Sequence, residues 1–419
     1  MIDAKFIRNN PELIRQTIVN KNEKADLDAI LSVDEKRRKL QYDFDTKKAE
    51  QNQASAQIAA LKKKGEDAQA ALNQVSSLAE DIKRINAELS ECNNLFEELM
   101  LRVPNIPHPH VPIGKDESAN RFIREWGSKP SFDYEPKDHI EIASQNSLLD
   151  LQRGAKISGS GFPVYTGLGA KLERALINFM LEFHLQKHGY QELGVPHLVN
   201  RKSMTGTGQL PKLEEDMYHV SEDDLFLIPT AEVPVTNFHM EENLSVAALP
   251  IKYVAYTPCF RREAGSYGKD TKGLQRLHQF NKVEMVRFTE PEKSYDALEE
   301  MLSDAEEILQ AFGLHYRVIE LCTGDLSFAS AKTYDIEVWA AGAQKYLEVS
   351  SVSNFEDFQA RRASIRYRDT EGKLRFVHTL NGSGVATPRL MIAILEASQQ
   401  ADGSIKIPEV LAPWMDIRL

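Results

Sequence analysis

The stretch "FRREAGSYGKDTKGLQRLHQF", residues 260–280, begins with Phe-Arg-x-Glu and ends with Arg-x-His-x-Phe. Apolar runs typical of strands flank it, "IKYVAYTPCF" before and "KVEMVRF" after. The pattern predicts two antiparallel strands joined by a glycine-containing loop. Arg261 would then end one strand and Arg276 would start the other, so that their guanidinium groups face each other at one mouth of the hairpin.

Two converging guanidinium groups are costly unless an anion fills the gap between them. Glu263 follows Arg261 by two residues, and in a strand that spacing places both side chains on one face. Phe280 offers a ring for stacking. These residues are candidates for an anion site. On spacing alone, however, a solvated hairpin tip with ordinary surface charges is the favoured interpretation.

The composition narrows the classes of protein. A chain of 419 residues can hold two or three domains. Its net charge of −11 means that a nucleic-acid site would have to be a local basic patch. The absence of an apolar run of about 18 residues and of an apolar N-terminal core predicts a cytoplasmic protein with no membrane span. Three scattered cysteines predict neither disulfides nor a zinc site: Cys92, Cys259 and Cys322.

Residues 27–101 differ from the rest of the chain. Apolar side chains recur at alternating spacings of three and four between Val75 and Leu99, which indicates a coiled-coil seam. The first half repeats the pattern less cleanly, with Arg37, Lys47 and Gln51 at seam positions. A turn at "KKKGEDAQ" makes the two helices antiparallel. Basic clusters such as "KRRK" leave two roles open for this arm, dimerisation or contact with RNA.

The remainder of the chain mixes strands and helices. "RVPNIPHPHVPIGKDES" (102–118) is typical of a linker. Helices are predicted over 167–190 and 387–398, among several strand-like runs with few βαβ alternations. This order predicts an α+β fold with a mainly antiparallel sheet. The chain has no P-loop, and "SGSG" (158–161) is more typical of a turn. A bound nucleotide would therefore have to be held by side-chain cations.

Three further segments carry candidate site residues. "PTAEVP" (229–234) places Thr230 and Glu232 on a strand-to-loop stretch. "YLEVSSVSN" (346–354) combines the Glu348 carboxylate with nearby serine hydroxyls, the oxygen ligands that suit Mg²⁺. Arg389 starts an apolar helix shortly after Ser383. On spacing alone, Glu284 could instead be a paired surface carboxylate and Ser383 a helix cap.

Together these segments resemble one known family. Residues 260–280 resemble motif 2 of the class II aminoacyl-tRNA synthetases, "GVATPRL" (384–390) resembles motif 3, and the helix ending at "YQELGVP" (190–196) resembles motif 1. Four more stretches are similar to seryl-tRNA synthetases of the bacterial type: "TGTGQLPKLEEDMY" (205–218), "PTAEVPVTN" (229–237), "YLEVSSVSNFEDFQARR" (346–362) and "TLNGSG" (379–384). The resemblance covers nearly the whole chain.

The resemblance implies an architecture and a reaction. An N-terminal helical domain (1–110), with its coiled-coil arm over 27–101, would precede an antiparallel-sheet class II catalytic domain (111–419). The enzyme would be a serine–tRNA ligase, which joins L-serine to ATP and transfers the seryl group to tRNA(Ser). Whether tRNA(Sec) is also charged stays open. A ligase that loads a carrier protein and a non-catalytic RNA-binding adaptor are the alternatives.

The resemblance also assigns partners and residues. It implies a homodimer formed through the motif 1 helix, with ATP and Mg²⁺ and without zinc. Arg261, Glu263 and Arg276 would be catalytic, and Glu348 and Ser351 would hold the metal. The serine pocket would comprise Thr230, Ala231, Glu232, Glu284 and Ser383. The ATP site would comprise Arg261, Arg262, Glu263, Arg276, Leu277, Phe280, Glu348, Val349, Ser350, Ser351 and Arg389, with adenine between Phe280 and Arg389.

Overall fold

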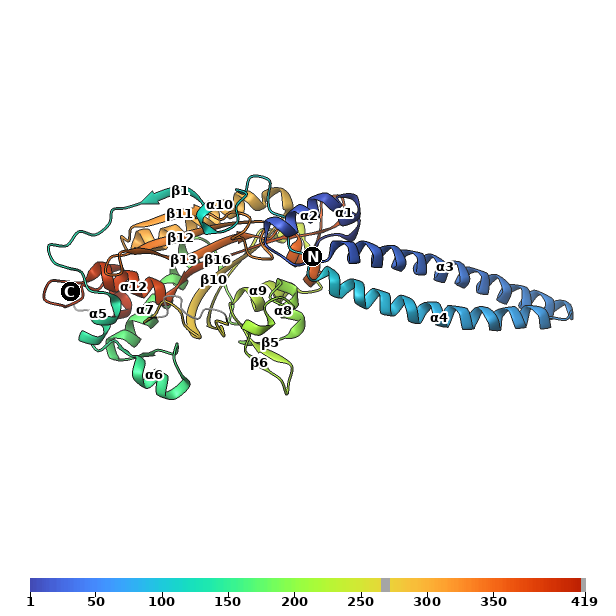
Figure 1. Cartoon of the computed structure of the whole chain (residues 1–419), viewed down its shortest axis with the longest axis horizontal. Helices are drawn as coiled ribbons and strands as arrows, with labels where there is room; N and C mark the ends of the chain where they lie inside the picture. The colour runs from blue at the N-terminus through green and yellow to red at the C-terminus, as the bar shows by residue number, and fades with distance from the viewer. Residues whose placement is uncertain (265–271, 416–419) are drawn as a thin grey trace. The chain divides into compact units, whose positions relative to one another are not determined.

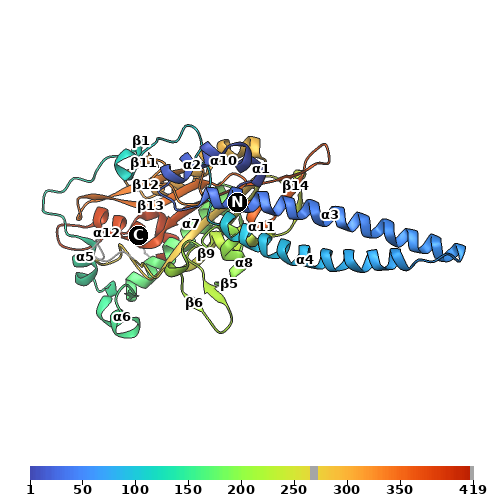
Figure 2. The ribbon, with the colours of Figure 1, turned by 45° about the vertical axis from the view of Figure 1, so that its right-hand side comes forward.

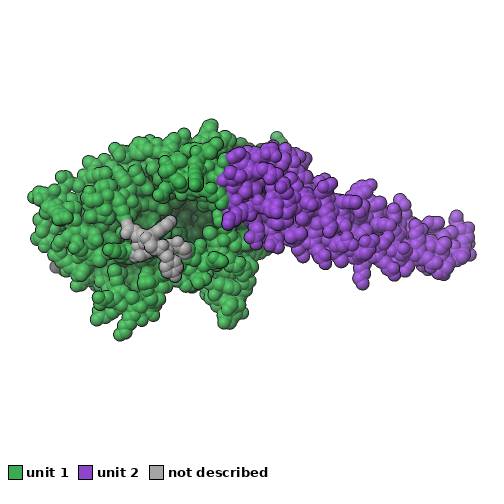
Figure 3. All heavy atoms as spheres, in the orientation of Figure 1, with its two compact units in different colours: residues 1, 20–22, 105–419 green, residues 2–19, 23–104 purple. Residues whose placement is uncertain are grey.

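The computed structural model describes residues 1–264 and 272–415, so the middle of the loop within 260–280 lies outside the described residues. The chain divides into two compact units, which Figure 3 colours separately. One comprises residues 2–19 and 23–104, called the helical unit below. The other comprises residues 1, 20–22 and 105–419, called the sheet unit. No helix in the described ranges is long and apolar enough to cross a membrane.

The helical unit is built around two long antiparallel helices. After α1 (Ala4–Asn9) and α2 (Pro11–Asn20), the helix α3 (Leu27–Lys64) runs out and α4 (Gln69–Met100) returns beside it (Figures 1 and 2). Gly65 ends α3 with φ +72°, a left-handed conformation that glycine adopts without a Cβ clash. The predicted helical hairpin is therefore confirmed.

Polar residues at the seam of this hairpin have specific partners. The Lys47 ammonium lies 3.2 Å from the Asp81 carboxylate, and the Arg37 guanidinium lies 4.6 Å from the centre of the Phe96 ring. Asp34 is 2% exposed and is surrounded by three arginines, with N–O distances of 2.8, 2.9 and 3.1 Å to Arg8, Arg37 and Arg38. A buried carboxylate is tolerated here because several cations compensate its charge.

In the described residues, the sheet unit contains an eight-stranded sheet with the order β1-β11-β12-β13-β16-β10-β9-β4. Neighbours are antiparallel except the short β4, which runs parallel to β9, so the prediction of a mainly antiparallel sheet is confirmed. The strands span β1 Arg121–Trp126, β4 Gln191–Glu192, β9 Ile251–Phe260, β10 Gln279–Thr289, β11 Tyr316–Glu320, β12 Lys332–Ala340, β13 Lys345–Asn354 and β16 His378–Ala386.

Helices cover this sheet. The predicted helices are present as α7 (Gly167–Lys187) and α12 (Thr387–Ser398), and they share one apolar core with α10 (Ser294–Ala311) and the sheet. The sheet unit also contains the helices α5 His139–Gln145, α6 Leu151–Ser158, α8 Arg201–Thr207, α9 Glu232–Thr236 and α11 Phe358–Ala363. The strands β5 Leu198–Asn200, β6 His219–Val220 and β7 Leu225–Leu227 form a separate three-stranded sheet.

Strand β10 is buried on both faces along most of its length. Val283 and Met285 belong to the core beneath α7, α10 and α12, whereas Val286 and Phe288 belong to a second core on the opposite face. Alternation along the strand places Glu284 on the face of Val286. The Glu284 carboxylate is thereby buried beside the apolar side chains of the same strand face.

The strands β9 and β10 pair antiparallel as predicted, but two expectations about the mouth between them are wrong. Strand β9 ends at Phe260 and β10 begins at Gln279, and the Arg261 N–H bonds the His278 carbonyl at 2.9 Å, so His278 rather than Arg276 lies opposite Arg261. Glu263 has φ +52°, so it does not continue the strand face of Arg261. A bulky residue adopts this left-handed conformation only where its surroundings hold it.

The segment 102–118 is not a free linker. From Asn105 onward it is hydrogen-bonded to the sheet unit, with backbone bonds from Asn105 to Phe328 at 3.0 Å and from His108 to Ala331 at 2.9 Å. Before the short helix η1 (Glu117–Ala119) the segment has no regular secondary structure, and two of its N–H groups, those of Asn105 and His108, donate to the loop at residues 328–331.

Candidate active site

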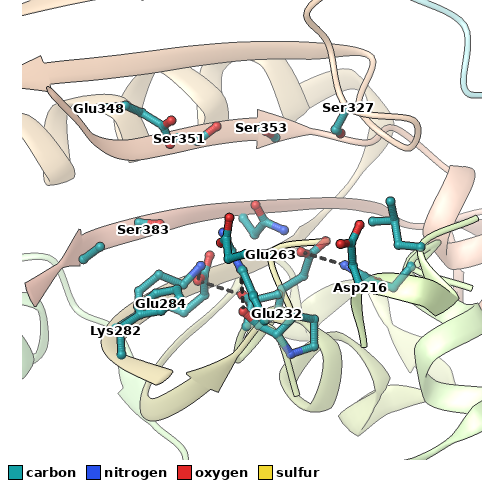
Figure 4. A pocket seen from close by; sticks show the side chains of 18 of the residues that line it. Asp216, Glu232, Glu263, Lys282, Glu284, Ser327, Glu348, Ser351, Ser353 and Ser383 are labelled. Carbon is teal, nitrogen blue, oxygen red and sulfur yellow. Dashed lines mark hydrogen bonds and ion pairs between the residues drawn. The ribbon is translucent and has the colours of Figure 1, made fainter. Parts of the chain in front are cut away.

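A cavity of about 670 Å³ lies in the sheet unit, within the usual size of a small-molecule site. It is bounded by β10, β13 and β16, by the hairpin mouth and by residues near α8 and α9 (Figure 4). Most of the residues predicted for the site line it: Thr230, Glu232, Arg261, Glu263, Arg276, Leu277, Phe280, Glu284, Glu348, Val349, Ser351, Ser383 and Arg389.

One end of the cavity holds two buried carboxylates. Glu284 is 2% exposed, accepts a hydrogen bond from the Thr230 hydroxyl at 3.0 Å, and forms a close ion pair with Lys282. Ser383 lies opposite Glu284 in the β10–β16 register. Glu284 is therefore not a surface carboxylate, and Ser383 lies within a strand rather than at a helix cap.

The second carboxylate, Glu232, is 9% exposed and begins the short helix α9 rather than lying on a strand-to-loop stretch. Its oxygens accept from the amide of Gln359 at 2.6 Å and, more weakly, from that of Gln209 at 3.4 Å. Burial raises the pKa of Glu232 to about 7, and the nearby Glu284 charge adds to the shift. A cationic ligand would favour the ionised form.

The arginines line the cavity with different partners. The Arg261 Nε donates to the Pro229 carbonyl at 3.3 Å, and its guanidinium lies 5.1 Å from the centre of the Phe280 ring. Arg276 donates to the Glu263 carboxylate at 3.1 Å. The left-handed backbone at Glu263 thus places its carboxylate against Arg276. The two arginines share one cavity, as predicted, although they are not register partners.

A second group of oxygens lies on β13. Figure 4 shows Glu348 and Ser351 on this strand, across the cavity from Glu232 and Glu284. Arg389 donates to the Glu348 carbonyl at 2.7 Å and lies 3.4 Å from its carboxylate. On the adjacent strand, Asp335 is the register partner of Ser351, and its buried Oδ1 atom has no hydrogen-bond partner among the described residues. An orphaned carboxylate oxygen beside Glu348 and Ser351 fits an oxygen-ligated cation such as Mg²⁺.

Three predicted residues do not line the cavity: Ala231, Arg262 and Ser350. Ala231 is buried in the second core. The Arg262 side chain donates to the Glu215 carbonyl at 3.3 Å. Ser350 is 1% exposed and donates to the Ser383 carbonyl at 2.6 Å, so its hydroxyl links β13 to β16.

Several residues that line the cavity or contact its lining were not predicted. Lys282 had a signal in the sequence, because it precedes Glu284 by two residues and so lies on the same, otherwise apolar, face of the strand. Gln209 and Asn381 lie within quoted motifs, but nothing in their spacing singles them out. Gln359 contacts Glu232 from α11, 127 residues away, and Asp335 meets Ser351 only through strand pairing.

Comparisons with known proteins agree with this architecture. Residues 1–107 match the model of the seryl-tRNA synthetase N-terminal domain, and residues 214–398 match the tRNA synthetase class II core domain (G, H, P, S and T). The chain is 56% identical to the serine–tRNA ligase of Caldicellulosiruptor saccharolyticus and 52% identical to that of Geobacter sulfurreducens. These alignments cover 99% of this chain and 99% and 98% of the relatives.

Solved structures show the same likeness. Seryl-tRNA synthetase from Pyrococcus horikoshii, complexed with ATP, superposes with a TM-score of 0.93 at 38% identity, over 100% of this chain and 98% of that one. The cytoplasmic serine–tRNA ligase of Naegleria fowleri, in complex with AMP, gives 0.87 at 28% identity, over 99% and 98%. With both family models matched in order and the whole length aligned, this chain belongs to the seryl-tRNA synthetase family.

Proposed function

We propose that this chain is a serine–tRNA ligase, which activates L-serine with ATP to seryl-adenylate and transfers the seryl group to tRNA(Ser). The observation that carries this proposal is one cavity lined both by two buried carboxylates, Glu232 and Glu284, and by the arginines Arg261, Arg276 and Arg389. Full-length similarity to serine–tRNA ligases supports it. The N-terminal match over residues 1–107 argues against the carrier-protein ligase, and the core match over residues 214–398 argues against the non-catalytic adaptor.

The carboxylate end binds serine in this proposal. Glu232 pairs with the substrate ammonium, while Thr230, Glu284 and Ser383 bond its carboxylate or hydroxyl. Lys282 neutralises Glu284, so that the pocket does not hold two uncompensated anions. A site that hydrogen-bonds a hydroxyl rejects the analogue lacking it by about 10⁴-fold, because its buried polar groups would be left unpaired. Alanine is therefore excluded chemically.

The part of the cavity lined by Arg261, Arg276 and Arg389 binds ATP in this proposal. In the activation step, a serine carboxylate oxygen forms a bond to the α-phosphorus while the bond from that phosphorus to the bridging oxygen breaks, releasing pyrophosphate. The carboxylate is already ionised, so no general base is needed. Arg261 stabilises the charge at the α-phosphate, and Arg276, held by Glu263, contacts the outer phosphates. Phe280 and Arg389 hold the adenine between them.

Glu348 and Ser351 hold Mg²⁺ in this proposal, with Asp335 beside them. The ion would neutralise phosphate charge and complete its coordination with phosphate and water oxygens. The orphaned Asp335 oxygen supports this role. Val349 and Ser350 belong to the same ATP-binding segment, with Ser350 acting through β16. Leu277 completes the nucleotide site, whereas Arg262, which bonds the Glu215 carbonyl and does not line the cavity, is given no direct contact with ATP. We propose no zinc.

Transfer of serine requires tRNA, and we assign its recognition to the arm. The domains are then residues 1–110 for tRNA binding and 111–419 for catalysis. Basic residues along the hairpin, such as Lys36, Lys62 and Lys83, suit the phosphates of an RNA helix that is recognised by shape.

The helix α7 forms a twofold interface in a homodimer. The reaction takes place in the cytoplasm, with its tRNA.

The test is serine-dependent exchange of pyrophosphate into ATP, run beside charging of tRNA(Ser). We expect exchange with serine and almost none with alanine, and charging of tRNA(Ser) but not of a tRNA for another amino acid. Including tRNA(Sec) in the charging assay decides whether this tRNA is a second substrate. Absence of exchange with serine, or equal exchange with alanine, would refute the assignment of the pocket.

A deletion of residues 31–98 tests the arm. It removes most of α3 and α4 and leaves the cavity residues in place. We expect exchange to remain close to wild type and charging to be lost. If both reactions fell equally, the arm would be structural rather than a tRNA-binding element.

A further inference from the structure

Lys21 is a buried lysine that serine activation does not use. It lies in residues 20–22, the short segment of the sheet unit between two stretches of the helical unit. Lys21 is 4% exposed, and its ammonium donates to three backbone carbonyls: Asn105 at 3.3 Å, Phe328 at 3.2 Å and Ser330 at 2.9 Å. An ammonium has three donors and no acceptor, so three converging carbonyls satisfy it and compensate its burial.

Asn105 holds the same loop from the second junction, where the chain returns from the helical unit. Its backbone N–H donates to the Phe328 carbonyl at 3.0 Å. Asn105 is 3% exposed, and its side-chain amide donates to the carbonyls of Ala329 and Phe355, both at 2.8 Å. Lys21 and Asn105 together therefore bond the carbonyls of three consecutive residues, 328 to 330.

This loop is part of the cavity wall. Ser327, Phe328 and Ala329 all line the cavity. Ala329 packs tightly against the loop after α8, since a Cβ added at Gly208 would lie 3.2 Å from the Ala329 Cβ. The next residue, Gln209, donates to Glu232 at 3.4 Å. The wall held by Lys21 thus adjoins the carboxylate end of the cavity.

We propose that Lys21 is a positioning residue for serine: it fixes the loop 327–330, and with it the wall beside Gln209 and Glu232, from the junction with the helical unit. It touches no substrate. The inference rests on the proposed function. Because the loop adjoins the carboxylate end, loss of the ammonium should weaken serine binding more than ATP binding. A displacement of the loop would be transmitted to its neighbours, because protein interiors are closely packed and hardly compressible.

The test compares Lys21→Met with the matched control Asn22→Ala in the full chain. Asn22 belongs to the same junction and bonds the carbonyls of Lys115 and Gly324, not the loop 327–330. In pyrophosphate exchange we expect Lys21→Met to raise the KM for serine about tenfold, less than the about hundredfold that a 1 Å misplacement costs. The KM for ATP should change less than about threefold, and Asn22→Ala should match wild type in both.

A second variant keeps the test decisive if Lys21→Met does not fold. Asn105→Ala removes the bonds to Ala329 and Phe355 and should produce the same preferential rise in the KM for serine. A folded variant with lowered thermal stability but an unchanged KM for serine would overturn the proposal, since the role would be structural only. If wild type itself lacked serine-dependent exchange, the proposed function would fail instead.

Discussion

Replacing Glu232 by Gln should change how serine activation depends on pH. Glu232 lies at the carboxylate end of the cavity with Glu284 and Lys282, and its pKa is raised to about 7 by burial and by the Glu284 charge. In our proposal the ionised carboxylate binds the serine ammonium. The enzyme before serine binds is then competent only when Glu232 has lost its proton.

The size of the effect follows from that pKa. At pH 6 about one in eleven molecules carries ionised Glu232, and at pH 8 about ten in eleven do. The kcat/KM for serine should therefore rise about tenfold from pH 6 to pH 8. Because the serine ammonium favours the ionised carboxylate, kcat at saturating serine should vary much less over this range.

The assay is pyrophosphate exchange at saturating Mg·ATP, with serine varied at each pH. Glu232→Gln removes the charge and keeps one oxygen that can accept from the Gln359 amide, while its own NH2 group replaces the oxygen that faces Gln209. Its kcat/KM should be lower than that of wild type and should lack the rise with pH that ionisation of Glu232 causes. Titration of ATP itself affects wild type and variant equally, and the ratio between them isolates Glu232. A ratio that stayed constant from pH 6 to pH 8 would refute the reasoning.

Stability provides an independent reading of the same group. The pKa of Glu232 is higher in the folded chain, about 7, than the ordinary 4.5, so its contribution to stability is complete below pH 4.5 and lost as the pH rises through 7. The loss is on the order of 3 kcal/mol by linkage. Relative to Glu232→Gln, wild type should lose about that much free energy of unfolding between pH 4.5 and pH 8.

Three further predictions concern the other side chains of the cavity. Arg261→Ala should lower the exchange rate at least about a hundredfold, as loss of a single charge-stabilising donor does, and a rate near wild type would remove its role. Glu348→Gln should raise the Mg²⁺ concentration needed for half-maximal exchange at fixed ATP, whereas an unchanged Mg²⁺ curve would place the ion elsewhere. Lys282→Met should raise the KM for serine by leaving Glu284 without its partner, with the KM for ATP as the internal control.

Long periodic elements were predictable from the sequence. The hairpin α3–α4 has heptad spacing in its second half, and β9, β10, β12 and β13 are apolar or alternating runs. Strands β1 and β11 were not recognised, and both are short. β1 is largely exposed at the sheet edge, so burial leaves little pattern in its residues.

The residues of the site likewise divide into those that the sequence predicted and those that it did not. Glu284 and Ser383 were assigned through the resemblance to the family, and the register of β10 and β16 brings them together. The contacts of Gln359 and Lys21 could not be predicted, because each joins segments more than 80 residues apart through a single side chain. The conformation of Glu263 was missed because a strand pattern does not reveal where the chain turns into the left-handed region.

The pairing of charges in the cavity gives a physical reason for the contacts of its arginines. Arg276, which faces the proposed phosphate site, is paired with Glu263, and Arg389, which faces the proposed adenine site, is paired with Glu348. Both cations are therefore already compensated. Without those carboxylates, like charges would accumulate in one cavity and oppose folding. Phosphate oxygens must compete with the carboxylates, which lowers the net affinity for any single anion. ATP, which offers several phosphates and a base for stacking, can engage both pairs and Phe280 at once, whereas a lone phosphate cannot. The same carboxylates that stabilise the cavity therefore favour a nucleoside triphosphate over simpler anions.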